Sequence, residues 1–221
     1  MSGWFADIVW ADIAQACLDT LAMLGGSLVL TILFGLPLGI ALFLTSPGQV
    51  WANRLGNGVL ALMVNLLRSV PFIILLIVMI PATVLLVGTS LGVAGAIPPL
   101  VVGAAPFFAR LVETALRGVD RNTVEAVQAM GATTRDLVWR ALLPEAMPGI
   151  VAAATVTAVA LVSFTAMAGV VGAGGLGDLA IRFGYQRFQT DVMVVTVALL
   201  LLLVQGIQML GDWLVRRLVR R

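Results

Sequence analysis

Long apolar runs separated by short polar breaks are the feature that most constrains the fold of this chain. Of its 221 residues, 61% are hydrophobic and 11% are charged, and the mean hydropathy is +1.09. Soluble domains carry about 25% charged residues, so water is not the main solvent of this protein. Several uncharged runs approach or exceed the roughly 20 residues that a helix needs to cross a bilayer. The sequence therefore predicts an all-α polytopic membrane protein with a single transmembrane domain over residues 1–221.

Five membrane spans are predicted from these runs and the breaks between them. The first covers about 20–44, where Pro37 between two glycines predicts a bend and close packing. The second covers about 59–87 and contains two prolines and an arginine. The last three are expected at about 91–111, 149–171 and 192–211.

The arginines predict how the spans are oriented. Five spans place the chain ends on opposite sides, and cytoplasmic loops are enriched in basic residues. One side carries two arginines, Arg182 and Arg187, and the other carries ten. We therefore expect the N-terminus outside and the segment 121–148, between spans 3 and 4, in the cytoplasm. The ten are Arg54, Arg110, Arg117, Arg121, Arg135, Arg140, Arg216, Arg217, Arg220 and Arg221.

The residue types that are missing exclude several kinds of chemistry. There is no His, no Lys, and a single cysteine, Cys17. An internal disulfide, a His/Cys zinc site and a His-based triad are excluded. Without a P-loop lysine, the chain is not expected to bind and hydrolyse ATP through a Walker site. No catalytic residue, metal or cofactor is expected on this chain. A net charge of +2 argues against nucleic acid as a partner, and the first residues lack the basic region of a cleaved signal peptide.

The longest polar stretch, residues 121–148, is called the elbow below. Asn122, with Glu125 three residues later, matches a capping box. It predicts a helix over 123–130, which Gly131 would end.

A second short helix is predicted after that glycine. Thr133 and Asp136 repeat the capping pattern, and Pro144 is expected to end the helix after Leu143. Each helix would be about 12–14 Å long at 1.5 Å per residue, too short for a hydrocarbon core of ~30 Å. The second helix is expected to expose an apolar face beside Arg135 and Arg140, made of Leu137, Val138, Ala141 and Leu142.

Two interpretations of the elbow remain open from this pattern. It could be an amphipathic linker that lies on the lipid headgroups. It could also insert into a groove of a soluble partner, with its apolar face docking there.

The elbow resembles the coupling loop of ABC importer permeases in the stretch EAVQAMGATTRDLVWRALLP, residues 125–144. Four further stretches are similar to methionine-importer permeases, so the likeness covers nearly the whole chain. These are NLLRSVPFIILL (65–76), VGTSLG (87–92), VGAAPFFARLVETAL (102–116) and VGAGGLGDL (171–179).

This resemblance implies a membrane-spanning permease subunit, not an enzyme, in the bacterial inner (cytoplasmic) membrane. It implies a homodimer on two ATP-binding cassette subunits, which would bind ATP and Mg, and a substrate-binding lipoprotein or periplasmic protein outside. The substrate would be D- and L-methionine. The elbow residues implied in coupling to the ATPase are Glu125, Ala126, Met130, Gly131, Ala132, Arg135, Leu143 and Pro144.

Two other motifs have structural and functional interpretations. The run Gly172–Gly177 matches G-x-G-x-x-G, but it follows a predicted span and lacks the strand–helix context of a dinucleotide site. A close-packed or flexible outer turn is the better interpretation of this run.

Arg110, Glu113 and Arg117 share one helix face. They form either an exposed ladder of weak ion pairs or a cytoplasmic gate or cassette contact.

Residues Arg68, Ser69, Ser163, Phe164 and Met167 are candidates for the translocation pathway or its gate. An arginine inside the bundle would be costly and functional. Snorkelling toward the cytoplasm is the slightly favoured alternative. The stretch 163–169 mixes small, polar and thioether groups, which fits either a pathway or small-residue helix packing.

Two other functions stay open. Apart from these, the permease could carry another small amino acid instead of methionine. An ion-coupled secondary transporter would need acidic or histidine relays inside the spans, and the mid-membrane stretches contain none. A purely structural membrane protein would have no reason to present a capped cytoplasmic elbow.

Overall fold

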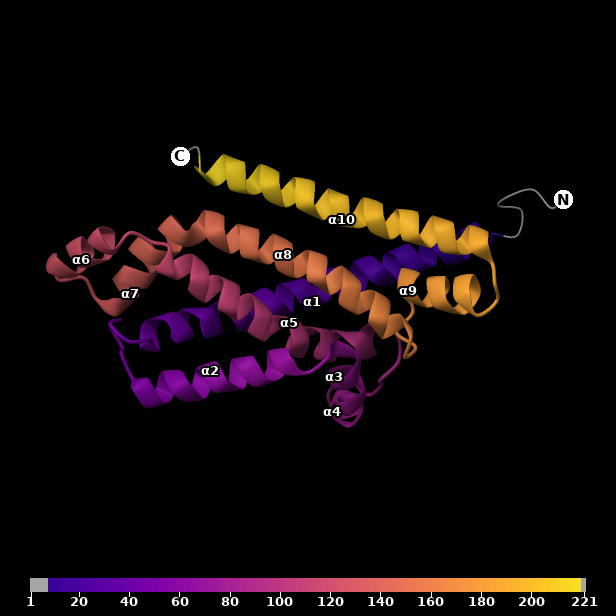
Figure 1. The fold of residues 1–221 in the computed structure, drawn as a ribbon, viewed down its shortest axis with the longest axis horizontal. Helices are drawn as coiled ribbons and strands as arrows, with labels where there is room; N and C mark the ends of the chain where they lie inside the picture. Colours follow the sequence, from indigo (N-terminus) through magenta and orange to yellow (C-terminus); the bar gives the residue numbers. More distant parts are fainter. Residues whose placement is uncertain (1–7, 220–221) are drawn as a thin grey trace.

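The computed structural model describes residues 8–219, and all regular elements in that range are helices. Four long helical segments run roughly along one direction (Figure 1). Each is long and apolar enough to cross a membrane, and a bent pair of shorter helices brings the number of possible spans to five. The long helices are α1 (Trp10–Thr45), α5 (Gly92–Arg117), α8 (Leu143–Gly169) and α10 (Thr190–Val219).

The predicted second span is broken rather than continuous. It consists of α2 (Arg54–Ser69), α3 (Phe72–Val78) and α4 (Ile80–Val87), and the chain bends by 100° between α2 and α3. The cause is Pro71, which has no N–H and disfavours a helical conformation at the preceding residue. Val70 accordingly has an extended backbone, with φ −79° and ψ 125°.

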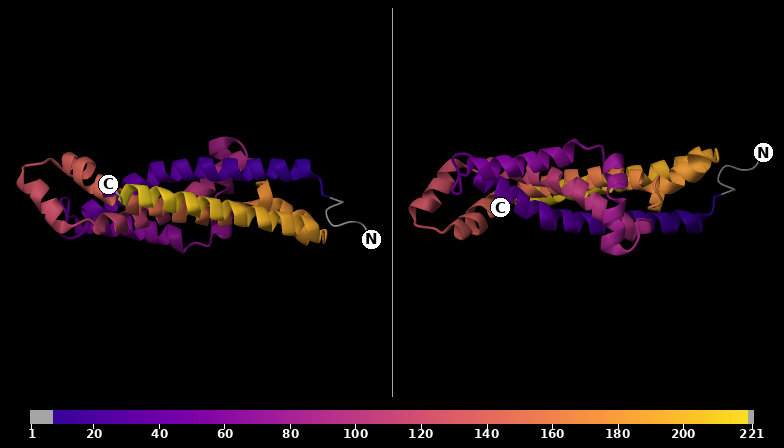
Figure 2. Two further views of the ribbon diagram at one scale, coloured as in Figure 1. Left: turned by 90° about the horizontal axis from the view of Figure 1, so that it is seen from above. Right: turned by 90° about the horizontal axis from the view of Figure 1, so that it is seen from below.

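The remaining short helices lie toward the two ends of the molecule. The elbow contains α6 (Arg121–Ala129), α7 (Thr134–Asp136) and the π-helix η1 (Leu137–Leu142). The opposite end contains α9 (Gly175–Leu179) and the π-helix η2 (Ala180–Tyr185). Figure 2 shows this elongated arrangement, with α6 and α7 at the end to which α10 runs and the start of α1 at the other.

The second elbow helix does not stop at Pro144, so that prediction was wrong. The helical path runs from Thr134 to Gly169 through η1 and α8. Pro144 occupies the first turn of α8. Pro144 has no N–H to donate to the preceding turn of this continuous helical path, yet the helix continues past it. The wider turn of η1 directly precedes it.

The core forms where α1 packs closely against α5. Gly35 and Gly39 of α1 are buried against the backbone of α5. A Cβ atom added at Gly39 would lie 2.6 Å from the carbonyl oxygen of Ala109 and 2.7 Å from Cβ of Val112. Small residues at such crossings let helix backbones approach each other, and the predicted close packing around Pro37 is confirmed.

The glycine run at residues 172–177 is a close-packed turn. The N–H of Leu176 donates to Oγ1 of Thr20 on α1 at 2.9 Å. A Cβ added at Gly177 would clash with Cα of Ala166 on α8. In residues 8–219 the run joins two helices and follows no strand, so the interpretation as a tight turn is confirmed.

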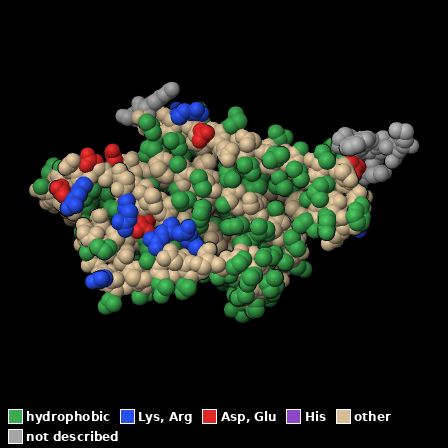
Figure 3. All heavy atoms as spheres, viewed as in Figure 1, with side chains coloured by type: hydrophobic (Ala, Val, Ile, Leu, Met, Phe, Trp, Pro, Cys, Tyr) green, Lys and Arg blue, Asp and Glu red, His purple; other side chains and the backbone are tan. Residues whose placement is uncertain are grey.

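Charge is distributed unevenly along the molecule. Charged side chains gather toward the end that holds α6 and α7, and most of the remaining visible surface is apolar (Figure 3). The arginines Arg182 and Arg187 lie at the opposite end, in and after η2. Arg220 and Arg221, which entered the predicted orientation, lie outside the described residues.

Candidate functional site

The first elbow helix, α6, begins two residues earlier than predicted, at Arg121 instead of residue 123. Asp120, not Asn122, is the cap, and its side chain accepts a hydrogen bond from the N–H of Asn122 at 2.9 Å. Glu125 does not complete a capping box. Its carboxylate instead accepts from Nε of Arg121 at 2.7 Å, one turn away along α6.

Gly131 forms the corner of the elbow. Its φ is +77°, in the left-handed region that favours glycine. Its N–H donates to the carbonyl of Gln128 at 2.9 Å, and that of Ala132 donates to Val127 at 3.4 Å. The predicted glycine stop is confirmed, with α6 ending at Ala129.

The predicted Thr133 cap is also confirmed. Its hydroxyl accepts from the N–H of Asp136 at 3.2 Å and donates to the Asp136 carboxylate at 2.7 Å. Arg140 lies 3.3 Å from the same carboxylate. The hydroxyl bond, and then the charge of Arg140, lower the pKa of Asp136 in this solvent-exposed part of the elbow. Thr133 and Asp136 thus fix the start of the second elbow helix.

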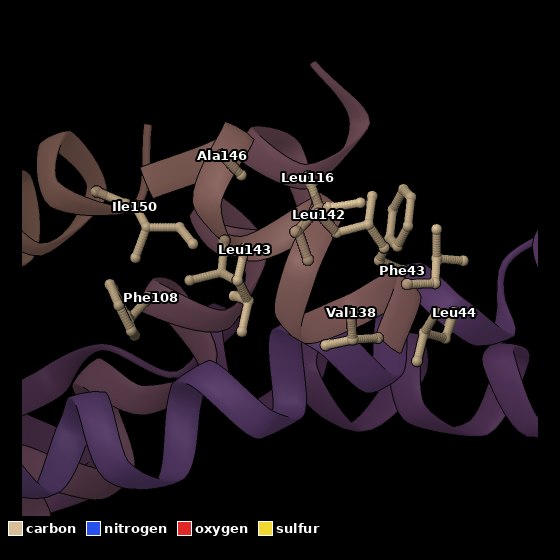
Figure 4. Packing of buried hydrophobic residues seen from close by; sticks show 13 residues of the cluster. Phe43, Leu44, Phe108, Leu116, Val138, Leu142, Leu143, Ala146 and Ile150 are labelled. Carbon is tan, nitrogen blue, oxygen red and sulfur yellow. The ribbon is translucent and has the colours of Figure 1, made fainter. Parts of the chain in front are cut away.

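The apolar face of η1 is buried within the chain, so the prediction that it is exposed was wrong. Leu137 is 2% and Leu142 is 1% exposed. They belong to a cluster that includes Phe43 of α1 and Leu116 of α5. Figure 4 shows Leu142 near Phe43 and Leu116, between the helices. Val124 and Val127 of α6 pack against the same cluster. The elbow is thus attached to α1, α5 and α8 by a continuous apolar core.

The outer surface of the elbow is what remains available to another molecule. Met130 is 78% and Trp139 is 64% exposed. Leu143, which the resemblance implied in coupling, is 6% exposed and belongs to the internal cluster. Eight of the exposed residues are called the elbow surface below: Glu125, Ala126, Gln128, Met130, Gly131, Arg135, Trp139 and Pro144.

An ion-pair network joins the elbow end of α5 to α2. The side chain of Glu113 is 6% exposed and accepts from Arg110 at 2.6 Å and from Arg117 at 2.8 Å. Arg110 also donates to Oδ1 of Asn65 on α2 at 3.1 Å. The predicted ladder of ion pairs is therefore confirmed, but Glu113 is buried rather than exposed, and two arginines satisfy its charge as buried carboxylates require.

One face of α5 carries polar residues along the bundle. Its members recur at helical spacing and are exposed or half-buried, whereas the opposite face is buried. Charged groups are costly against lipid tails. This face therefore lies along a polar path or against another protein surface. Its residues are Gly103, Phe107, Arg110, Thr114 and Arg117.

The polar face leads to an aromatic cleft with a volume of about 400 Å³. The guanidinium of Arg68 lies over the ring of Phe107, 5.6 Å from its centroid. The rings of Phe72 and Phe164 are stacked, with centroids 4.5 Å apart and an interplanar angle of 8°. The lining residues are Leu67, Arg68, Val70, Phe72, Leu75, Gly103, Phe107, Ala160 and Phe164.

Arg68 lies deep along α2 rather than near its start. It is fourteen residues after Arg54, about 21 Å at 1.5 Å per residue. Its guanidinium contacts Phe107, which lies ten residues before the end of α5. The Arg68 side chain is exposed and also lines the cleft, so snorkelling toward the cytoplasm and entry into the bundle both stay predictions.

A family model described as "Binding-protein-dependent transport system inner membrane component" matches residues 32–221. The chain belongs to this family. The resemblance to binding-protein-dependent permeases, predicted from the elbow and the four further stretches, is confirmed.

Relatives of this inner membrane component carry methionine transport names. The chain is 50% identical over 171 residues to the methionine import system permease protein MetP of Bacillus subtilis, covering 77% of each chain. It is 50% identical over 151 residues to the D-methionine transport system permease protein MetI of Escherichia coli strain K12, covering 68% of this chain and 70% of that one.

Solved structures agree with this family assignment. A chain from the inward-facing MetNI methionine ABC transporter superposes with a TM-score of 0.95 at 45% identity, covering 97% of this chain and 99% of that one. A chain of an amino acid ABC transporter superposes with a TM-score of 0.79 at 15% identity, covering 98% and 99%. This second likeness concerns the fold alone.

The five candidate pathway residues of this inner membrane component do not all meet in one place. Arg68 and Phe164 line the cleft. Ser69 lies beside it, with its hydroxyl donating to the carbonyl of Asn65 at 2.8 Å. Ser163 and Met167 are exposed on α8 and are not among the lining residues.

Sequence reasoning missed all of the cleft lining except Arg68 and Phe164, and it missed Gln128 and Trp139 on the elbow surface. Phe72, Phe107 and Gly103 line the cleft, and Trp139 stands exposed on the elbow. The helical spacing of Gly103, Phe107 and the arginines that follow was a usable signal for the polar face. Nothing in the sequence brings Phe72 to Phe164, since this stack depends on the bend at Pro71.

Proposed function

We propose that this chain is the membrane-spanning permease subunit of an ABC importer for methionine. The observation that carries the proposal is the near full-length superposition on a MetNI chain, with a TM-score of 0.95 at 45% identity. The methionine names of relatives at 50% identity support the substrate. Because relatives are named for methionine and for D-methionine, both stereoisomers are proposed.

The elbow surface transmits the work of a partner ATPase. The partner binds ATP and Mg and hydrolyses ATP. This chain takes no direct part in either binding or hydrolysis. Its nucleotide cycle moves the elbow surface, and the buried cluster around Leu142 carries that movement into α1, α5 and α8. Direct packing suits this task, since tightly packed interiors are stiff and transmit strain.

The assembly contains two copies of this chain, two ATP-binding cassette subunits and a binding protein on the outer side. The complex lies in the bilayer of the bacterial cytoplasmic membrane. The arginine-rich elbow end faces the cytoplasm, as positive-inside bias predicts. The end with α9 and η2 faces outward, toward the delivering lipoprotein or periplasmic protein.

The translocation path follows the polar face of α5 and the aromatic cleft. Arg68, Ser69 and Phe164 line or flank its narrow part. Ser163 and Met167 of α8 belong to its gate, where flexible thioether side chains adapt to different shapes.

Single-cysteine labelling tests the orientation. In a Cys17→Ser background, Met130→Cys should react with a membrane-impermeant thiol reagent only in inverted vesicles. Arg187→Cys should react only in intact cells from which the outer membrane barrier has been removed. Labelling of Met130→Cys from outside would overturn the proposed arrangement.

Co-purification tests the coupling role. Glu125→Arg reverses a charge on the elbow surface, and Gly131→Pro demands a negative φ where the corner needs +77°. Both should reduce recovery of the ATPase with the tagged permease, whereas Arg187→Gln at the opposite end should not. An unchanged complex in both elbow variants would contradict a coupling role for this surface.

A further inference from the structure

We propose that Arg68 recognises the carboxylate of the transported amino acid inside the aromatic cleft. This inference rests on the proposed function and names the residues of this chain that contact the substrate. The cleft would thus select a zwitterion with an apolar side chain while it crosses, in addition to any selection by the delivering protein.

The charge balance of the cleft is the first support. Among residues 8–219, no acidic side chain forms a salt bridge with Arg68, whereas Arg110 and Arg117 share Glu113. The ring of Phe107 offers the guanidinium a cation–π contact. A planar guanidinium presents a fork of N–H donors that matches a carboxylate. An anionic group from a ligand would therefore supply the counter-charge that this part of the chain does not provide.

The end of α2 supplies a matching site for the ammonium group. Pro71 has no N–H, so the carbonyl of Leu67 is deprived of its usual donor four residues on. Leu67 lines the cleft beside Arg68. The last carbonyls of a helix carry a partial negative charge. The Arg68 guanidinium and the unpaired carbonyl oxygens at the end of α2 thus lie within one helical turn. The carboxylate and ammonium groups of an α-amino acid are also close together, so both could be bound here.

The opposite side of the cleft fits an apolar side chain. The Phe72–Phe164 stack and Leu75 form its wall, and sulfur makes favourable contacts with aromatic rings. Gly103 keeps this wall open, because an added Cβ would lie 3.2 Å from the ring of Phe72. The volume of about 400 Å³ falls within the range of small-molecule sites.

Transport by the reconstituted complex tests the inference. The permease, its ATPase and the binding protein are placed in proteoliposomes, and L-methionine uptake is measured together with ATP hydrolysis. Arg68→Gln keeps a polar side chain but removes the charge and the guanidinium fork. It should lower uptake roughly 10- to 100-fold, the range for a lost hydrogen bond between charged groups, while ATP hydrolysis continues. The ATP consumed per methionine imported should rise by the same factor.

Two further variants separate charge recognition from structure. Arg68→Lys keeps the charge without the planar fork and should recover part of the uptake lost in Arg68→Gln. Arg54→Gln removes an exposed arginine from the start of the same helix and should stay within twofold of the wild type. Assembly of every variant is checked by size-exclusion chromatography.

The outcomes distinguish this inference from the proposed function. If the wild-type complex imports methionine and Arg68→Gln imports it equally well, the inference is refuted and the function stands. If Arg68→Gln and Arg68→Lys both fail to assemble, Arg68 holds the two permease copies together instead, which also refutes the inference. Failure of the wild-type complex to import methionine would refute the proposed function itself.

Discussion

Truncation of Leu142 tests whether buried packing holds the elbow rigidly against α1, α5 and α8. This side chain is 1% exposed and lies in the cluster that joins η1 to α1, α5 and α8. Replacing a buried leucine by alanine removes transfer free energy and leaves a cavity, which costs about 2.7–5 kcal/mol. Leu142→Ala should lower the free energy of local elbow opening by an amount within that range.

Hydrogen–deuterium exchange measures this local opening directly. At 1.36 kcal/mol per factor of ten, the amides of Leu137–Leu142 should exchange roughly 100- to 5,000-fold faster in the complex that carries Leu142→Ala. Amides in the middle of α10 should be unchanged, because α10 contributes no residue to this cluster. Because the elbow of Leu142→Ala is less rigidly packed, ATP hydrolysis should continue in this variant while methionine import falls.

Leu55→Ala is the matched control, because Leu55 is 84% exposed at the start of α2. It should leave both the elbow exchange and the import close to wild type. The argument is refuted if Leu142→Ala leaves exchange of the η1 amides unchanged. It is equally refuted if those amides exchange much faster while import per ATP stays at the wild-type value.

Three further substitutions test separate parts of the structure. Gly39→Val should abolish folded, monodisperse complex in size-exclusion chromatography, because its Cβ meets the backbone of α5, whereas Gly25→Val should not, since nothing lies within 4 Å. Glu113→Gln removes the negative charge between two half-exposed arginines. It should lower the free energy of unfolding by about 2 kcal/mol, less than the ~3–5 kcal/mol for breaking a fully buried ion pair. In a scanning fluorimetry melt this is a fall of about 4–8 °C. Gly131→Ala places a side chain at a left-handed backbone position, which costs about 1 kcal/mol. Hydrogen exchange of the amides around Gly131 should become about fivefold faster. Unlike Gly131→Pro, this variant should still bind the ATPase.

The helical class, the possible number of spans and the corner of the elbow could be predicted from the sequence. These depend on local signals: apolar runs long enough for a bilayer, the glycine at a positive φ, and the Thr133 side chain beside the N–H of Asp136. Local signals act over one or two turns of helix, so a single sequence reveals them.

The fate of the apolar face of η1 could not be predicted in the same way. An amphipathic pattern shows that Leu137 and Leu142 need to be buried, but not what buries them. The answer depends on Phe43 and Leu116, which come from distant parts of the chain and are brought there by the close crossing of α1 and α5. The elbow therefore uses this face internally and leaves Met130 and Trp139 exposed.

The prolines show the same limit. Pro37 and Pro106 lie inside continuous helices, whereas Pro71 ends one and starts a sharp bend. Each removes one N–H, and whether the helix continues depends on the packing around it. Because the cleft exists only through the bend at Pro71, its combination of Arg68 with the Phe72–Phe164 stack could not be deduced from the sequence.

Reconstituted transport tests the central claim most directly: that this chain is a passive path driven by the nucleotide cycle of a partner. In proteoliposomes with the partner ATPase and the binding protein, we expect methionine uptake that requires ATP and stops when the ATPase is omitted. The purified chain alone should neither hydrolyse ATP nor accumulate methionine in response to a proton or sodium gradient. Gradient-driven uptake or ATP hydrolysis by the chain alone would contradict the account.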